Sequence, residues 1–387
     1  MKIRIERDAL AEAVQWAARS LPNRPSVPIL AGLLVKAAGD KVALSSFDFE
    51  TSARISLPAQ VSEDGTALVS GRLLAEISRS LPARPVDIST DASAMTLVCG
   101  SARFTLQLLP VEDYPELPPM PPAAGVIDAA QFASAVSQVV VAAGRDELLP
   151  VFTGVRVEIA DDQVSLLATD RYRMALKEVG WTPNAKGTAD ALVPARVLAE
   201  TAKSLTGGDE ITISLAPAGA GQGDGLIGFE GGGTAGTRQI TTRLLDGEFP
   251  KLRHIMDIKA TASVRVNTAE LVAAVKRVGL VAERNTSLRM TIGQESITLE
   301  AATGDQAQAV EAVEAVVEDV TGAGLSITAA GFNPHYLSDA LSVLDAPYVS
   351  FAFTAPGKPC LLTGLDDIAG DPKPDYRHVI MLMRLPA

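Results

Sequence analysis

The sequence predicts an α+β protein built from three copies of one unit, each with two helices packed on antiparallel sheets. The first observation is an internal repeat: ALVSGRLLAEISRSL (67–81) and ALVPARVLAETAKSL (191–205) align without a gap. A third segment, 326–344, keeps the order of a short apolar strand, a small-residue turn and a helix. The second observation is the length, because 387 residues exceed what one ordinary core can organise. Helices among alternating strands cover one face of a sheet, which favours the α+β class.

The remaining elements of the unit recur in a fixed order. Each unit begins with a longer helix that has apolar residues at helical spacing, expected at 7–21, 128–144 and 268–283. An apolar strand, a turn and a second strand follow, at 42–57, 164–179 and 297–313. An acidic turn that leads into an aromatic residue and Pro closes the first two units, at 108–117 and 242–252.

This order divides the chain into domains. Segments 118–125 and 257–262 have the composition of linkers. We therefore expect three domains, over 1–120, 126–254 and 262–387. The alternative is a chance similarity among Ala-rich helices, but three ordered elements that each recur three times are hard to produce by composition alone.

The composition is typical of a globular protein that does not enter membranes. Hydrophobic residues make up 47% and charged residues 21%, and no apolar run approaches the roughly 20 residues of a membrane-spanning helix. The N-terminal stretch MKIRIERDAL alternates like a strand and lacks the pattern of an export signal. Cys99 and Cys360 lie far apart without metal-ligand spacing, which favours reduced thiols in a cytoplasmic protein.

Catalytic chemistry is not indicated. The three histidines, His254, His335 and His378, show neither ligand spacing nor a nucleophile and base arrangement. No pair of carboxylates stands in an acid-base context. The sequence therefore predicts a protein that is not an enzyme and uses no cofactor or metal, although a hydrolase with an unrecognised carboxylate site stays open as an alternative.

The charge distribution bears on nucleic acid. A net charge of -12 argues against strong phosphate binding by the average surface. Six candidate helices, counted over 7–20, 72–81, 128–145, 196–205, 268–284 and 334–344, nevertheless contain ten Lys and Arg against eight Asp and Glu, while the rest of the chain has 24 against 38. A shared helix face could therefore attract a duplex backbone, through Arg72, Arg79, Arg196, Lys203, Lys276 and Arg277. No aromatic residues interleave with these bases, so stacking on single strands is not indicated, and solvated helix faces without a ligand are the alternative.

The C-terminal stretch VIMLMRL (379–385) is apolar where a terminus is ordinarily polar and frayed. Two interpretations explain it. The stretch is a buried closing strand of the third unit, or it forms part of a surface on which another molecule docks.

Taken together, five motifs in the threefold unit resemble the bacterial β sliding clamp family. They are MKIRIERDALAEAV at the start, NRPSVPILAGLLV (23–35), ATDRYRMAL (168–176), LDGEFPKLRHI (245–255) and VIMLMRL (379–385). The resemblance covers essentially the whole chain. It implies the DNA-clamp fold and a processivity factor of the replicative DNA polymerase, which is a head-to-tail homodimer closed into a six-domain ring around duplex DNA.

The resemblance also assigns residues to surfaces. Arg24 matches the family's loop arginine that touches DNA, and Phe104, Leu280 and Val281 are expected at the dimer contact. Short peptides of the polymerase, the clamp loader and repair proteins are expected in an apolar pocket. Its residues are expected to be Phe152, Thr169, Arg171, Tyr172, Arg173, Met174, Pro250, Ile255, Val379, Met381, Leu382, Met383, Arg384 and Leu385. Met suits such a site because its flexible side chain repacks around different anchors.

The sequence departs from the family's pattern at the pocket. Leu382 stands where the family usually has Pro, and Arg171 and Tyr172 stand where smaller or differently polar residues are common. These differences bear on which peptides and inhibitors the pocket accepts. The alternative function is a scaffold of the same fold that recruits peptides without encircling DNA.

Overall fold

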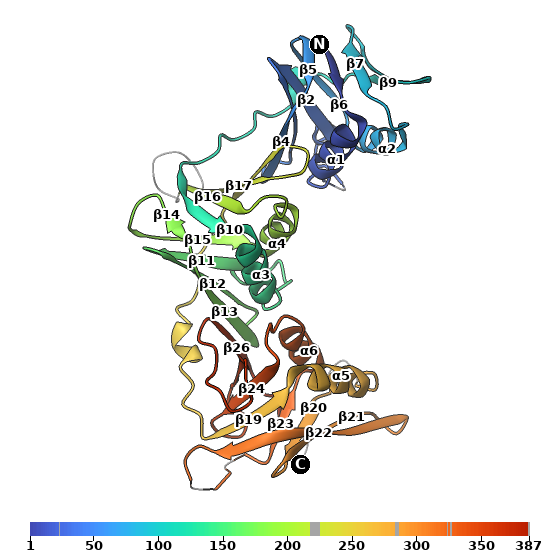
Figure 1. Ribbon diagram of the computed structural model, residues 1–387. Helices are drawn as coiled ribbons and strands as arrows, with labels where there is room; N and C mark the ends of the chain where they lie inside the picture. Colours follow the sequence, from blue (N-terminus) through green and yellow to red (C-terminus); the bar gives the residue numbers. More distant parts are fainter. Residues whose placement is uncertain (23, 217–224, 283–285, 323, 326, 386–387) are drawn as a thin grey trace.

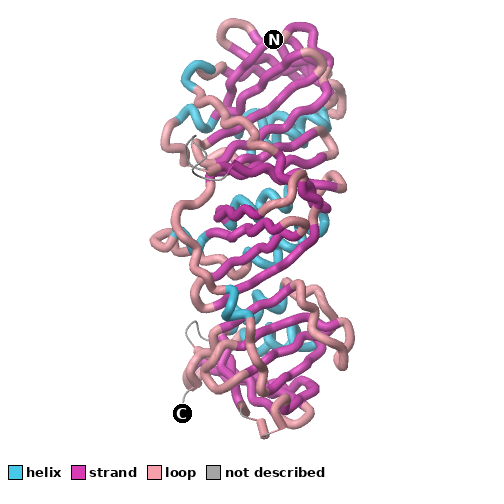
Figure 2. Tube along the Cα trace, turned by 90° about the vertical axis from the view of Figure 1, so that its left-hand side faces the viewer, coloured by secondary structure: helices cyan, strands magenta, loops and turns pink. Residues whose placement is uncertain are grey.

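A computed structural model describes residues 1–387 except 23, 217–224, 283–285, 323, 326 and 386–387. Figure 1 shows three units in a row, with the N-terminus at one end and the C-terminus at the other. The row bends into a crescent, and the helices of all three units lie on its right-hand, concave side in Figure 1. Figure 2, turned by 90° so that the left-hand side of Figure 1 faces the viewer, shows strands in front and α-helices behind them in every unit. The α+β expectation is therefore confirmed, with sheets outside and helices inside the curve.

The first unit contains two α-helices and nine strands. Its elements are β1 (Lys2–Ile5), α1 (Arg7–Ala18), η1 (Pro28–Ala31), β2 (Gly32–Ala38), β3 (Lys41–Phe47), β4 (Thr51–Pro58), β5 (Gln60–Glu63), β6 (Gly65–Ser70), α2 (Gly71–Ser80), β7 (Val86–Thr90), β8 (Ala94–Cys99), β9 (Ala102–Gln107) and η2 (Val111–Asp113).

The second unit repeats this order. It contains β10 (Ala123–Asp128), α3 (Ala129–Val140), η3 (Pro150–Thr153), β11 (Gly154–Ala160), β12 (Gln163–Thr169), β13 (Arg173–Gly180), β14 (Thr182–Pro183), β15 (Thr188–Pro194), α4 (Ala195–Ser204), β16 (Glu210–Ala216), β17 (Leu226–Gly232) and β18 (Thr237–Arg243). A connector with one short 3₁₀ helix, η4 (Arg253–Met256), leads to the third unit.

The third unit completes the repeat. It contains β19 (Ala262–Asn267), α5 (Thr268–Gly279), β20 (Leu288–Ile292), β21 (Ser296–Thr303), β22 (Ala307–Asp319), β23 (Ala329–Phe332), α6 (Pro334–Ser342), β24 (Tyr348–Phe353), β25 (Cys360–Leu365) and β26 (Tyr376–Ile380). The expected domain bounds stay predictions, and the last two residues of the third domain lie outside the described part.

The six predicted helices are confirmed, but the long ones end three or four residues earlier than expected. α1, α3 and α5 stop at Ala18, Val140 and Gly279. Beyond α3, the amides of Ala142 and Ala143 bond three residues back, to Val139 and Val140. The chain after α3 therefore forms a tighter, 3₁₀-type turn that keeps apolar residues at nearly helical spacing. A prediction from periodicity alone includes this turn in the helix and so places the end of the helix too late.

Sheets run without interruption from one unit into the next. β4 pairs antiparallel with β18, which joins the first and second units in a nine-stranded sheet. β13 pairs antiparallel with β26, which joins the second and third units in a twelve-stranded sheet. Backbone hydrogen bonds between paired strands therefore hold both junctions, so the units are joined by continuous sheets and not only by the segments that connect them in sequence.

The helices bury their apolar faces against these sheets. One core cluster passes through the first two units, and the third unit has its own. In α1, for example, Leu10, Ala13, Val14 and Ala17 are buried, in accordance with the predicted period of an amphipathic helix. None of the helices that the structure describes is long and apolar enough to cross a bilayer.

Candidate functional site

An apolar cavity of about 220 Å³ opens where β12, β13 and β26 meet the connector. It is lined by Phe152, Thr169, Arg171, Arg173, Met174, Pro250, Leu252, Ile255, Val379 and Met381. Met174 and Val379 are buried in a hydrophobic cluster that includes Phe249 and so form a rigid floor. A concave apolar surface with a few polar groups at its rim suits an apolar segment of another molecule.

The turn between β12 and β13 shapes one rim of this cavity. The carboxylate Oδ1 of Asp170 accepts hydrogen bonds from the amides of Tyr172 and Arg173, both at 3.0 Å. Thr169 Oγ1 accepts from the amide of Arg171 at 3.1 Å and donates to the Arg173 carbonyl at 2.7 Å. These bonds hold Arg171 at a φ of 80°, in the left-handed region that a non-glycine residue occupies only when its surroundings enforce it.

The same turn occurs in the first unit, which supports the repeat. Asp48 Oδ1 accepts from the amides of Glu50 and Thr51 at 3.0 and 2.7 Å. Phe49 follows with a φ of 76°. The short polar side chain of Asp therefore builds the turn in both units, and the residue after it adopts the strained conformation.

The connector forms the opposite rim of the cavity and is bonded to the sheet below it. Arg253 donates to Glu158 Oε2 at 3.0 Å and to Ser165 Oγ at 3.2 Å, and it also pairs with Glu178. Arg156 Nη1 donates to the Phe249 carbonyl at 3.4 Å. Pro250, Leu252 and Ile255 are thereby held over β11, β12 and β13 as a wall.

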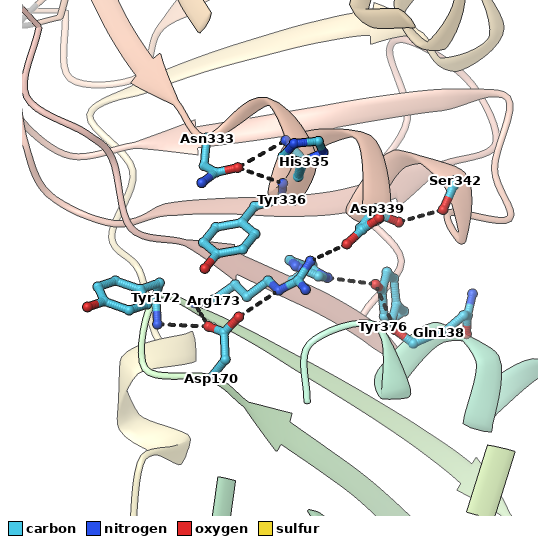
Figure 3. Close-up of polar contacts among 11 residues, drawn as sticks. Gln138, Asp170, Tyr172, Arg173, Asn333, His335, Tyr336, Asp339, Ser342 and Tyr376 are labelled. Carbon is cyan, nitrogen blue, oxygen red and sulfur yellow. Dashed lines mark hydrogen bonds and ion pairs between the residues drawn. The ribbon is translucent and has the colours of Figure 1, made fainter. Parts of the chain in front are cut away.

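A larger cleft, of about 520 Å³, adjoins the apolar cavity at the junction of the second and third units. Arg173 lines both, and its guanidinium bonds Asp170 at 3.0 Å and Asp339 at 2.7 Å. Figure 3 shows this contact between the turn and α6, with Tyr336 beside the guanidinium. The cleft is therefore charged, in contrast to the apolar cavity next to it.

Nine of the fourteen residues expected in the pocket line the apolar cavity. Tyr172 lines the neighbouring cleft instead and is 55% exposed. Leu252 lines the cavity but was not predicted. Its position between Pro250 and Ile255 in one short segment is the signal that could have identified it.

The last four residues expected in the pocket wall follow Met381. Leu382, Met383, Arg384 and Leu385 line neither of the two cavities. β26 ends at Ile380, after which the Met383 amide donates to the Gly331 carbonyl at 2.8 Å. Leu382 packs against the core of the third unit. The tail after Met381 is therefore bonded to the third unit, and its expected place in the pocket wall stays a prediction.

A buried polar pair lies on β26. His378 is fully buried, and its Nδ1 lies 2.9 Å from the Tyr376 hydroxyl, which donates to the Gln138 carbonyl at 3.2 Å. Within the described residues His378 Nε2 has no hydrogen-bond partner. Burial, with a smaller effect of Arg173, lowers the pKa of His378 to about 3, so the ring is neutral at neutral pH.

Five of the residues expected to face DNA belong to α2, α4 and α5, helices of the concave side, and Arg24 lies in the segment between α1 and η1. Arg24, Arg72, Arg196, Lys203, Lys276 and Arg277 are all exposed. Arg196 is 84% exposed and pairs with Glu200 one helical turn away, at 3.2 Å. Arg277 donates to Glu311 on β22, and this bond holds the pKa of Glu311 below its usual value.

The residues expected at a dimer contact lie at the two ends of the crescent. Phe104 is 36% exposed on β9, which is the last strand of the five-stranded sheet. Leu280, directly after α5, is 84% exposed, and Val281 is partly buried. The structure does not bring these residues together within one chain.

In the part of the chain that the structure describes, no group of three or more His, Cys, Asp or Glu side chains is placed so that it could hold a metal ion.

The resemblance noted in the sequence is matched by family models over each unit in turn. The N-terminal, central and C-terminal domains of the DNA polymerase III beta subunit match residues 1–118, 126–251 and 253–384.

Named relatives extend this match. The beta sliding clamp of Streptomyces coelicolor is 53% identical over 386 residues, covering 100% of both chains. That of Micrococcus luteus is 48% identical over 319 residues, covering 82% of this chain and 100% of the relative. A solved sliding clamp from Pseudomonas aeruginosa, bound to griselimycin, has a TM-score of 0.88 at 23% identity, with 100% of both chains covered.

These matches follow the three units in order and confirm the predicted DNA-clamp fold. They also favour the clamp over a scaffold that never encircles DNA. The chain belongs to the family of DNA polymerase III beta subunits, the sliding clamps that serve replication as processivity factors and not as enzymes.

Proposed function

We propose that two copies of this chain join head to tail into a closed ring, through β9 of one copy and the first half of β22 of the other. Residues 102–107 pair on one side only, with β8. Residues 307–314 of β22 pair with β21 but not with β19, which bonds only residues 315–319. Each described end of the crescent thus offers a strand edge that can continue into a partner's sheet.

Side chains near the two edges are complementary. β9 carries Arg103 and Phe104, both exposed. The other end carries the exposed Leu280 and, on β22, Glu314. Apolar contact between Phe104 and Leu280 would supply most of the stabilisation, because rim charges contribute mainly to orientation and association rate.

The ring would enclose duplex DNA along the helices. Six helices per copy line the concave side, and their exposed bases, together with Arg24, would contact phosphates without reading sequence. Outside the helices the chain has 24 Lys and Arg against 38 Asp and Glu, so the protein would be held by topology and not by affinity. Weak contacts of this kind allow the ring to slide along the duplex.

We place the protein in the cytoplasm, where the chromosome is replicated.

The apolar cavity would dock short peptides of proteins that work on the enclosed DNA. By the family's pattern these are the replicative polymerase, the clamp loader and repair proteins. The cavity supports this assignment because its floor is rigid while Met381 at its rim is 40% exposed and can adapt to different apolar anchors.

Retention on circular DNA tests the ring. The observation that carries the proposal is the family match through all three units. The protein is loaded onto a nicked circle with its cognate loader and ATP, isolated in high salt, and the circle is then cut. Release only after cutting is the expected result. Loss in salt before cutting would indicate ordinary electrostatic binding and would favour the peptide-recruiting scaffold.

A further inference from the structure

Arg173 is a buried cation held by two domains at once. Its side chain is 7% exposed, and its Nε donates to Asp170 Oδ2 at 3.0 Å while Nη1 donates to Asp339 Oδ2 at 2.7 Å. The guanidinium carbon lies 4.4 Å from the centre of the Tyr336 ring. A buried guanidinium is costly unless both its charge and its N–H groups are satisfied, so each carboxylate limits where Arg173 can lie.

The hydrogen bonds of Asp170 extend this constraint to the rim of the apolar cavity. While Oδ2 of Asp170 binds Arg173, its Oδ1 holds the amides of Tyr172 and Arg173. The Tyr172 carbonyl in turn accepts from the Met381 amide at 2.8 Å. A continuous chain of bonds therefore runs from Asp339 through Arg173, Asp170 and the turn to Met381.

We propose that Asp339 is a positioning residue for the peptide pocket. Asp339 does not line the apolar cavity, but it fixes Arg173 and, through Asp170, the strained turn that carries Arg171 (Figure 3). This inference rests on the proposed function of the cavity. Without the Asp339 carboxylate, Arg173 keeps one anionic partner instead of two, and the rim formed by Arg171 and Met381 loses its support from the third domain.

The junction itself offers a matched control. Lys177, four residues along β13 from Arg173, forms an ion pair with Asp375 of the third domain. Asp375 is 46% exposed and Asp339 43%, so the two carboxylates are similarly placed with respect to solvent. Lys177 and Asp375 line neither cavity. Removing Asp375 therefore weakens the junction without touching the chain of bonds to the pocket.

The experiment compares Asp339→Asn with Asp375→Asn in the full-length protein. The probe is a fluorescently labelled short peptide from the cognate replicative polymerase, and its Kd is measured by anisotropy. We expect Asp339→Asn to weaken binding about tenfold, the scale of one hydrogen bond between charged groups, and Asp375→Asn to bind like wild type. Equal affinity of Asp339→Asn and wild type, or an equal loss in both variants, would overturn the proposal.

Two further readouts separate positioning from damage to the fold. In Asp339→Asn the amides of Tyr172, Arg173 and Met381 should exchange hydrogen faster, while those of α6 should exchange as in wild type. If Asp339→Asn does not fold, Asp339→Glu keeps the charge on a longer stem and is expected to bind more weakly than wild type. Wild-type affinity in that variant would overturn the positioning role. Failure of wild type to bind the peptide would instead overturn the proposed pocket.

Discussion

His378 makes folding sensitive to acid. Its pKa is lowered to about 3 by burial, whereas an unfolded His titrates near pH 6.5, at about the usual value. As the pH falls below that value, the unfolded chain takes up a proton that the folded chain does not. The free energy of unfolding should therefore decrease, by about 2 kcal/mol between pH 7.5 and 5 for this one group.

Urea unfolding at the two pH values measures this effect. In His378→Gln the loss of stability on acidification should be smaller than in wild type, whatever the absolute stability of the variant. His254→Gln is the control, because His254 is exposed on η4 and should leave the wild-type difference unchanged. An identical pH dependence in all three proteins would show that His378 does not contribute.

Single residues also mark the limit of the sequence analysis. Thr169, Met174 and Val379 were predicted for the pocket, because they belong to motifs with recognisable neighbours. Asp339 was not assigned a role, because one acid on a helix carries no pattern and is indistinguishable from a solvated charge. Its partner is distant in sequence, and only the packed junction brings the two together.

The connector is an element whose place depends on polar bonds. Arg253 bonds Glu158, Ser165 and Glu178, on three neighbouring strands, and so holds the wall of Pro250, Leu252 and Ile255. We expect Arg253→Met to raise the Kd of the polymerase peptide about threefold, since partly exposed ion pairs contribute less than about 1 kcal/mol each. The dimer should be unaffected.

Arg289→Met is the matched control for Arg253→Met. Arg289 is 44% exposed, against 47% for Arg253, and pairs with Glu300 in the third domain, away from both cavities. Anisotropy titrations of the two variants give the comparison. If Arg253→Met binds as tightly as wild type, then the buried Phe249 and Met256 suffice to hold the wall.

At the level of elements, helices were easier to predict than sheets. The apolar period of a helix is local, so all six were found and only their ends were wrong. The pairing of β13 with β26 joins strands about 200 residues apart, and no local pattern specifies such a register. The wall expected at residues 382–385 stays a prediction, and the bridge from Met383 to Gly331 on a distant strand is likewise a contact that no local pattern specifies.

At the scale of the whole molecule, Leu280 is exposed at the end of the crescent that is proposed to contact the second copy. Leu280→Asp would place a charge in the apolar contact with Phe104. We expect the dimer dissociation constant to rise at least about tenfold, as for a central contact residue. Sedimentation equilibrium measures it, and peptide binding by the monomer should persist, because the cavity lies within one chain.

Leu148→Asp is the control for Leu280→Asp. Leu148 is 88% exposed, which is close to the 84% of Leu280. It lies in the loop before η3 of the second unit, away from both strand edges. This variant should remain a dimer. Dissociation of both variants, or of neither, would contradict the proposed contact.

The apolar cavity is closed by β26 and Met381, which follow every other described strand of the chain. During synthesis, the helices proposed to face DNA and β9 are complete long before that wall leaves the ribosome. A chain interrupted before Val379 would lack Val379 and Met381 of the proposed peptide pocket and the pairing of Val379 and Ile380 with β13. The proposed recruitment of partners would therefore require a chain translated at least as far as Met381.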